Sequence, residues 1–162
     1  MKTSLQRIAT AAACVLSLAV LTACETQEQQ RRTLVEHFQQ MSAGEWRNES
    51  GARLFIAPVR ARMVSDEAIY IERHAANGDV FARLIAIEAS SDAKKVLQRG
   101  LAFTQDGQWR NLREAPEMFT ALLPKDVRPA GTCNITVTDD ANELSYSCSG
   151  SAPEKFTRVL QE

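Results

Sequence analysis

Few side chains in this 162-residue sequence are of the types that most often act as nucleophiles or metal ligands. There are two histidines, His37 and His74, and four cysteines. A zinc site needs three or four such ligands at set spacings, and the sequence has no P-loop, dinucleotide-binding or serine-nucleophile motif. The sequence therefore predicts no metal site and no catalytic residue, and it leaves enzymatic activity undecided.

Cys24 is the cysteine with the most specific context. Lys2 and Arg7 give the N-terminal region a positive charge. An uncharged, mostly apolar run then follows to Leu21. That run has the length of a signal-peptide core and is too short to span a bilayer. It ends in Leu-Thr-Ala-Cys, which resembles the bacterial lipobox, whose cysteine receives a diacylglyceryl group and, after cleavage, an N-acyl chain such as palmitate. We expect residues 1–23 to be a signal peptide and Cys24 to be lipidated; the alternative is an ordinary secretory signal.

The residue after Cys24 indicates to which membrane the lipoprotein would be sorted. Glu25 is not the aspartate that typically retains lipoproteins in the inner membrane, so the resemblance implies the outer membrane, on its periplasmic side. Three acyl chains would anchor stably, where one gives marginal binding. Residues 24–32 are polar and rich in Gln, which predicts a tether before a folded domain at 33–162. The formal net charge of −1 argues against a nucleic-acid partner.

Cys133 and Cys148 are the two cysteines left in the predicted domain. Apolar and polar residues alternate over 132–138, and the alternation returns over 143–148 after a turn. A hairpin with a four-residue turn places the two cysteines opposite each other on its apolar face. Two thiols in an oxidising compartment are typical of one disulfide. A redox pair is the alternative, but the apolar neighbours give no cause for a lowered thiol pKa.

A second hairpin is predicted to turn at Asn77-Gly78, the preferred pair for a two-residue turn. Folding the chain there places Glu72 opposite Arg83, with Tyr70 and Phe81 on the same face. Such a face, both apolar and charged, suits the lined interior of a barrel. We expect Tyr70, Glu72, Phe81 and Arg83 to bind a ligand, with Arg83 meeting a carboxylate. The alternative is that Glu72 and Arg83 only pair with each other.

The remaining elements are predicted from periodicity. Leu34, Phe38 and Met41 share one face of a helix that Gly44 ends. From Glu45 onward, period-two runs separated by turn residues predict an antiparallel β-meander. A turn at 106–107 would join a strand over 96–104 to one over 109–112. Residues 115–123 would form a short helix that plugs or caps an opening.

Several short motifs occur in an order shared with one family. They are Gly44-Glu45-Trp46, Tyr70-Ile71-Glu72, a strand with Arg83, the stretch 122–126 and a Gly-Cys element at 131–133 with Cys148 as the second cysteine. From Phe38 to about Gly150 the chain resembles the CpcT/CpeT chromophore-lyase family. The resemblance implies a calycin-like, up-and-down barrel with a central pocket. This agrees with the mainly β meander, the N-terminal helix and the one short helix predicted above.

Related barrels in that family attach open-chain tetrapyrroles to cysteines of antenna proteins. Tyr70, Glu72 and Arg83 match the family pattern, whereas Val80, Phe81 and Ala82 replace its Tyr, Arg and Gln. Antenna proteins are cytoplasmic, while this chain carries an export signal. We therefore interpret the chain as a divergent, lipoprotein-type relative.

Three functions remain as hypotheses. The first is an outer-membrane-anchored lipoprotein whose barrel binds a small hydrophobic or amphipathic ligand. The second is an envelope structural or assembly lipoprotein with a filled barrel that acts through protein contacts. The third, a phycobilin lyase, is implied by the resemblance alone. We expect no resident cofactor, with a bound tetrapyrrole or lipid as the alternative. The expected partners are the membrane, through the lipid anchor, and either a small ligand or an envelope protein.

Overall fold

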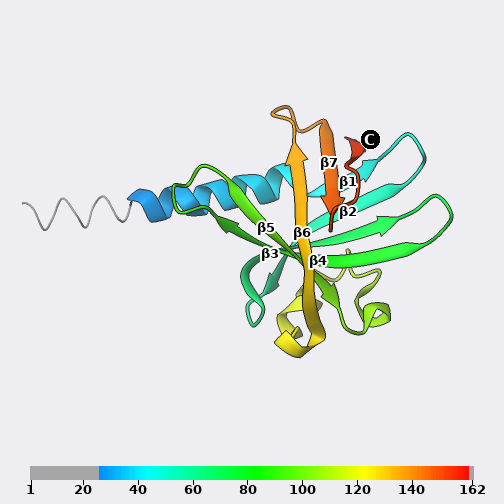
Figure 1. Cartoon of the computed structure of the whole chain (residues 1–162), viewed down its shortest axis with the longest axis horizontal. Coiled ribbons are helices and arrows are strands. Elements are labelled where there is room, and N and C mark those ends of the chain that lie inside the picture. Colours follow the sequence, from blue (N-terminus) through cyan, green and yellow to red (C-terminus); the bar gives the residue numbers. More distant parts are fainter. Residues whose placement is uncertain (1–25, 161–162) are drawn as a thin grey trace, which may run out of the picture.

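The computed structural model describes residues 26–160, which form a helix over 26–42 followed by a closed barrel (Figure 1). Every strand pairs antiparallel with the next one in the chain, and β1 pairs with β8. The predicted mainly β, up-and-down barrel is confirmed. Its eight strands are β1 (Gly44–Arg47), β2 (Arg53–Ala61), β3 (Ser65–His74), β4 (Val80–Ala89), β5 (Val96–Phe103), β6 (Val127–Val137), β7 (Glu143–Cys148) and β8 (Glu154–Arg158).

Apolar side chains fill the interior of the barrel. They come from every strand except β5, and Val96 of β5 packs against them. None is more than 9% exposed. An eight-stranded barrel is just wide enough for its own side chains to fill it. The members of this inner cluster on the strands are Trp46, Leu54, Ile56, Ile69, Ile71, Ile85, Ile87, Ala89, Cys133, Ile135, Leu144, Tyr146 and Phe156.

The helix packs against one end of the barrel, which we call the helix end. Val35 is buried in the inner cluster, and Leu34 and Phe38 pack against it, so part of the predicted apolar face is confirmed. The Arg158 guanidinium donates hydrogen bonds to the carbonyl oxygens of Met41 and Ala43 and lies 4.2 Å above the Trp46 ring. A cation at this position satisfies carbonyl groups that a helix leaves unpaired at its C-terminus.

The helix also includes residues 26–32, which the sequence assigned to a tether. These residues have no apolar period, and most of them are exposed. Contacts to the end of β4 and to the loop after it accompany this part of the helix. Gln27 donates to the Ser91 carbonyl at 2.7 Å, and Arg31 donates to the Ala89 carbonyl at 3.3 Å. Polar tertiary contacts therefore hold a segment for which the apolar pattern predicts no structure.

A second apolar cluster lies on the outer face of β2–β5. The connection between β5 and β6 covers it with three 3₁₀ turns, η1 (Asp106–Trp109), η2 (Pro116–Ala121) and η3 (Pro124–Asp126). Phe119 and Leu122 are fully buried there. The helical character predicted over 115–123 is confirmed as 3₁₀ helix, but the segment covers the outer face of the sheet and not an opening.

The predicted hairpin at 106–107 is wrong. β5 pairs with β6, and residues 109–112 form no strand. The Trp109 ring stacks on Phe103 at 5.5 Å between centroids, so this residue packs down onto the outer cluster instead of continuing a sheet. The Asp-Gly pair begins a turn, but the partner of β5 comes later in the chain.

The predicted register of the β3–β4 hairpin is also wrong. The Ala75 N–H donates to the Asp79 carbonyl at 2.8 Å, and the Gly78 N–H donates to the Ala75 carbonyl at 3.0 Å, which encloses a three-residue turn. A two-residue Asn-Gly turn needs positive φ at both central residues. Gly78 has φ 91°, but Asn77 is not among the residues with positive φ. Consequently Glu72 lies opposite Ala82, and Arg83 lies opposite Ile71.

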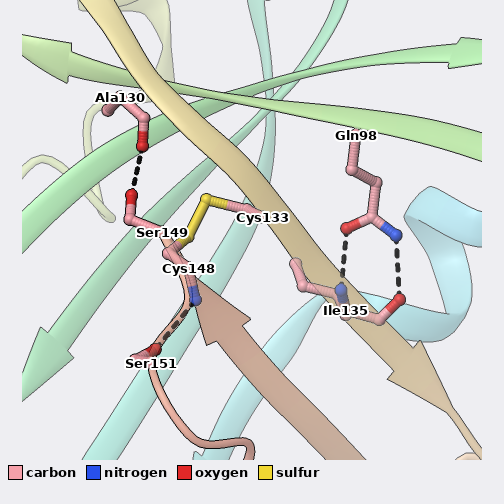
Figure 2. The surroundings of a disulfide bond; sticks show 7 residues. All are labelled: Gln98, Ala130, Cys133, Ile135, Cys148, Ser149 and Ser151. Atoms are coloured by element: carbon pink, nitrogen blue, oxygen red, sulfur yellow. Dashed lines mark hydrogen bonds between the residues drawn. A yellow bond between two sulfur atoms is a disulfide. The ribbon is translucent and has the colours of Figure 1, made fainter.

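The β6–β7 hairpin has the predicted register and the predicted disulfide. Cys133 lies opposite Cys148 with 4.1 Å between their Cα atoms, and their sulfur atoms are bonded (Figure 2). Gly100 is required beside this bridge, because a Cβ there would lie 2.6 Å from Cys133 Sγ. The Gln98 carboxamide accepts from the Ile135 N–H at 2.8 Å and donates to its carbonyl at 2.9 Å, which links β5 to β6 where their backbone pairing has ended (Figure 2).

Candidate functional site

A buried carboxylate is the centre of the first candidate site. Tyr70, Glu72 and His74 alternate along β3 and therefore share its outer face. Glu72 is 0% exposed. Its Oε2 atom lies 2.6 Å from the Tyr70 hydroxyl and accepts the N–H of Asn111, and its Oε1 atom lies 2.5 Å from His74 Nε2. The segment after η1 therefore closes over the carboxylate.

Hydrogen bonds keep this carboxylate charged. Burial alone would raise the pKa of Glu72, but hydrogen bonds from His74, Tyr70 and Asn111 outweigh it and hold the pKa below its ordinary value. Asn111 supplies its N–H from a left-handed backbone conformation with φ 58°, which Asn tolerates better than most residues. The ionised form of Glu72 thus contributes to the folded state.

His74 is the member of this network that reaches solvent. Its side chain is 27% exposed. The His74 and Phe55 rings pack edge to face, with 5.2 Å between their centroids. The Arg113 guanidinium lies 4.1 Å above the same Phe55 ring. A carboxylate that orients an imidazole can support general-base chemistry. No serine, threonine or cysteine is hydrogen-bonded to His74 among the described residues, so the arrangement lacks a nucleophile.

The structure divides the four predicted ligand-binding residues into two pairs. Tyr70 and Glu72 lie on the outer face of the sheet. Arg83 lies opposite Ile71, which belongs to the inner cluster, so Arg83 and Phe81 project from the inner face of β4. The predicted common face is wrong because the extra turn residue shifts the register by one, which exchanges the faces of one strand. The predicted alternative, a Glu72–Arg83 pair, is wrong for the same reason.

The second candidate site lies at the other end of the barrel, which we call the hairpin end. The β3–β4 turn lies at this end, across the barrel from the helix (Figure 1). Tyr146 and Glu154 lie opposite each other on β7 and β8. Arg73 of β3 donates to Glu154 at 2.9 Å, although β3 and β8 are not neighbours in the barrel. This ion pair therefore spans the hairpin end.

Tyr146 reports on the electrostatics of the hairpin end. Burial raises the pKa of its hydroxyl, Arg83 and Arg73 act against that rise, and Glu154 adds to it. Both arginines therefore act on the Tyr146 hydroxyl. Arg83 itself makes no hydrogen bond or ion pair with any residue in the described part of the chain, and none of its nitrogen atoms is fully buried.

Sequence reasoning missed His74, Asn111, Arg73, Tyr146 and Glu154 as site residues. The alternation Tyr70-x-Glu72-x-His74 is a signal that could have identified the first network, since one strand face holds all three side chains. No comparable signal joins Arg73 to Glu154, because they lie far apart in the sequence and on strands that do not pair.

Other predictions have different outcomes. Cys24 and the predicted signal peptide at 1–23 lie outside the described residues. No group of three or more His, Cys, Asp or Glu side chains within 26–160 could hold a metal ion. No helix in that range is long and apolar enough to cross a membrane. Five surface pockets include none of the four predicted ligand-binding residues in their lining.

Comparison of the chain with models of protein families, with curated proteins and with solved structures finds no match. The resemblance to the CpcT/CpeT family therefore stays a prediction. Any function must be argued from the barrel and its two candidate sites.

Proposed function

We propose that this chain is a lipid-anchored envelope protein whose filled barrel acts through contact with another protein. The observation that carries the proposal is the packing of the interior. Ile69 and Ile85 lie opposite each other at 0% exposure, and Trp46 is buried to the same degree. A ligand enclosed in the barrel would have to displace these side chains, at a cost of several kcal/mol in lost packing, about 2–5 kcal/mol for each large side chain.

The anchor would determine which end of the barrel a partner reaches. A lipid on Cys24 would lie just before the helix and would hold the helix end toward the membrane. The hairpin end, with Arg73 and Arg83, would then face away from the lipid and into the periplasm. This orientation supports a role in which the hairpin end contacts a soluble or membrane-bound partner.

Native mass spectrometry tests the filled interior. The full chain would be purified from bacterial membranes in a non-ionic detergent and incubated with lipid extract, haem and bilins. We expect the mass of the lipidated chain alone for Arg83→Gln, which removes the unpaired positive charge at the hairpin end and leaves the interior of the barrel unchanged. Ile85→Ala is the matched control, because a cavity left in an apolar core can admit a small apolar probe such as benzene. A small molecule bound to Arg83→Gln as well as to the wild type, and lost on denaturation, would contradict the proposal and favour ligand binding inside the barrel.

Labelling in living cells tests the anchor and the contact surface. We expect an alkyne analogue of palmitate to label the wild type and not Cys24→Ala. A photo-crosslinking amino acid at Asn77, exposed in the β3–β4 turn, should yield one discrete crosslinked partner. The same group at Lys94, exposed in the loop at the helix end, should not. Equal labelling of Cys24→Ala, or identical crosslinks at both positions, would contradict the proposal.

A further inference from the structure

The charges on the inner face at the hairpin end do not balance. Glu154 is already engaged, because it accepts hydrogen bonds from Arg73 at 2.9 Å and from Asn48 at 3.4 Å. Arg83 has no such partner in the described residues, and the Nε atom of Arg73 is buried without a hydrogen bond. Arg73 is paired with Glu154 and Arg83 is not paired, which leaves one positive charge unpaired.

An exposed aromatic ring accompanies this charge. Phe81 lies directly opposite Arg73 and two residues before Arg83, on the same face of the sheet. Its side chain is 52% exposed, the largest exposed fraction of any Phe, Trp or Tyr within 26–160. An apolar group on a ligand could pack against this ring while its charged group reaches Arg83.

Buried side chains close the barrel beneath Arg83 and Phe81. Tyr146 is 9% exposed, and the inner cluster of apolar side chains continues beneath it. A ligand at the hairpin end would therefore rest on the end of the barrel and would not enter the interior. The Tyr146 hydroxyl makes no hydrogen bond with another described residue and offers a further donor to an anion at this position.

We propose that Arg83, Arg73 and Phe81 form a binding site for an amphipathic carboxylate at the hairpin end of the barrel. A guanidinium presents paired N–H donors that match a carboxylate in two parallel hydrogen bonds. Arg83 binds the carboxylate, Arg73 adds positive charge beside it, and Phe81 contacts the apolar part. The carboxylate belongs either to a free small acid or to the C-terminus of a polypeptide. This inference does not depend on lipidation of Cys24.

Saturation-transfer NMR on the full chain in phosphatidylcholine nanodiscs tests the site, with 3-phenylpropanoate as the probe and its amide as the uncharged analogue. We expect the acid to bind about ten-fold more tightly than the amide, as a charged hydrogen-bonded pair would give. Arg83→Gln should abolish this preference. Arg60→Gln, which removes an equal charge from an exposed position on β2, should leave it unchanged.

A second variant separates the charge from the apolar contact. Phe81→Ala should weaken the binding of the acid and of the amide by the same factor. The ratio of the two affinities should therefore stay unchanged. Arg83→Lys keeps the charge but not the paired donors, and it should reduce the ratio without abolishing it. If the acid and the amide bind the wild type equally, and the peptide acid and peptide amide described below do so too, the proposal is overturned without recourse to any variant.

Two peptides distinguish the sources of the carboxylate. A hexapeptide ending in Phe with a free carboxylate is compared with the same peptide as its amide. Tighter binding of the peptide acid than of 3-phenylpropanoate identifies a polypeptide C-terminus as the ligand, and weaker binding identifies a free small acid. Absence of any acid preference in both series overturns the site, whereas failure of the anchoring experiments above leaves it standing.

Discussion

Glu72 is a charged residue that solvent does not reach. A buried carboxylate is costly unless hydrogen bonds compensate for its lost hydration. Here one oxygen accepts from Tyr70 and the Asn111 N–H, and the other from His74. The Tyr70 hydroxyl also lies 2.8 Å from the Trp109 carbonyl oxygen. The Glu72 side chain thus holds the segment after η1 against the outer face of β3.

Removal of the Glu72 charge should destabilise the protein. Glu72→Gln keeps the volume but turns an NH₂ group toward donors, so at least one of them loses its acceptor. We expect the free energy of unfolding to fall by about 1–3 kcal/mol, measured by urea denaturation. Glu114→Gln is the control, because the Glu114 side chain is 86% exposed. Equal stability of Glu72→Gln and wild type would contradict the network.

The same residue predicts a pH dependence. Because the folded pKa of Glu72 is lower than its ordinary value of 4.5, its stabilising contribution is complete above the unfolded pKa. That contribution is lost as the pH falls through the folded pKa. The difference in unfolding free energy between wild type and Glu72→Gln should therefore shrink on acidification. Taking the difference between the two unfolding free energies cancels the contributions of Asp92 and Asp140, whose pKa values are also lowered. A difference that grew on acidification would contradict the assignment.

At the scale of elements, the β3–β4 turn decides which side chains meet. Its three residues place Arg83 and Phe81 on the inner face of the sheet and leave Glu72 on the outer face. Type I turns followed by a left-handed residue are the usual form of a three-residue hairpin loop. Gly78 occupies that left-handed position, with φ 91°.

Substitution of Gly78 tests this turn. A Cβ at Gly78 would meet nothing within 4 Å, so the backbone conformation alone sets the cost. We expect Gly78→Ala to lower the unfolding free energy by about 1–2 kcal/mol, the cost of the left-handed conformation for an L-residue. Gly107→Ala is the matched control, since it has equal space and no positive φ. We would compare the two variants by thermal unfolding. Equal effects on the unfolding free energy would contradict the left-handed conformation of Gly78.

At the scale of the whole molecule, one closed sheet separates two apolar clusters. The inner cluster fills the barrel beside the helix, and the outer cluster lies beneath the β5–β6 connection. The disulfide joins β6 to β7 at the hairpin end, between strands that complete the barrel after that long connection. Closure therefore depends on contacts from both halves of the chain.

Loss of the disulfide should weaken the whole barrel. The bridge closes a loop of 15 residues, for which chain entropy predicts about 3 kcal/mol. We expect the Cys133→Ser/Cys148→Ser variant to lose about 2–4 kcal/mol in unfolding free energy. Wild type unfolded in a reducing agent should match it. Alkylation of both cysteines in unreduced, denatured wild type, located by peptide mapping, would show that no bridge had formed.

The sequence by itself determined the local features of this protein. It predicts the β6–β7 hairpin with its register and cysteine pair, because strict alternation and a four-residue turn allow one pairing. It also predicts a helix before Gly44 and a mainly β meander. The first candidate site was predicted only in part, through Tyr70 and Glu72.

Tertiary structure alone decided the rest. Ile69 and Ile71 on one face of β3 and Tyr70 and Glu72 on the other are all buried, so hydrophobicity could not select between registers one residue apart. The partner of β5, the cover over the outer face and the Arg73–Glu154 pair join residues distant in sequence. Such contacts depend on how the sheet closes, and no local pattern encodes that closure.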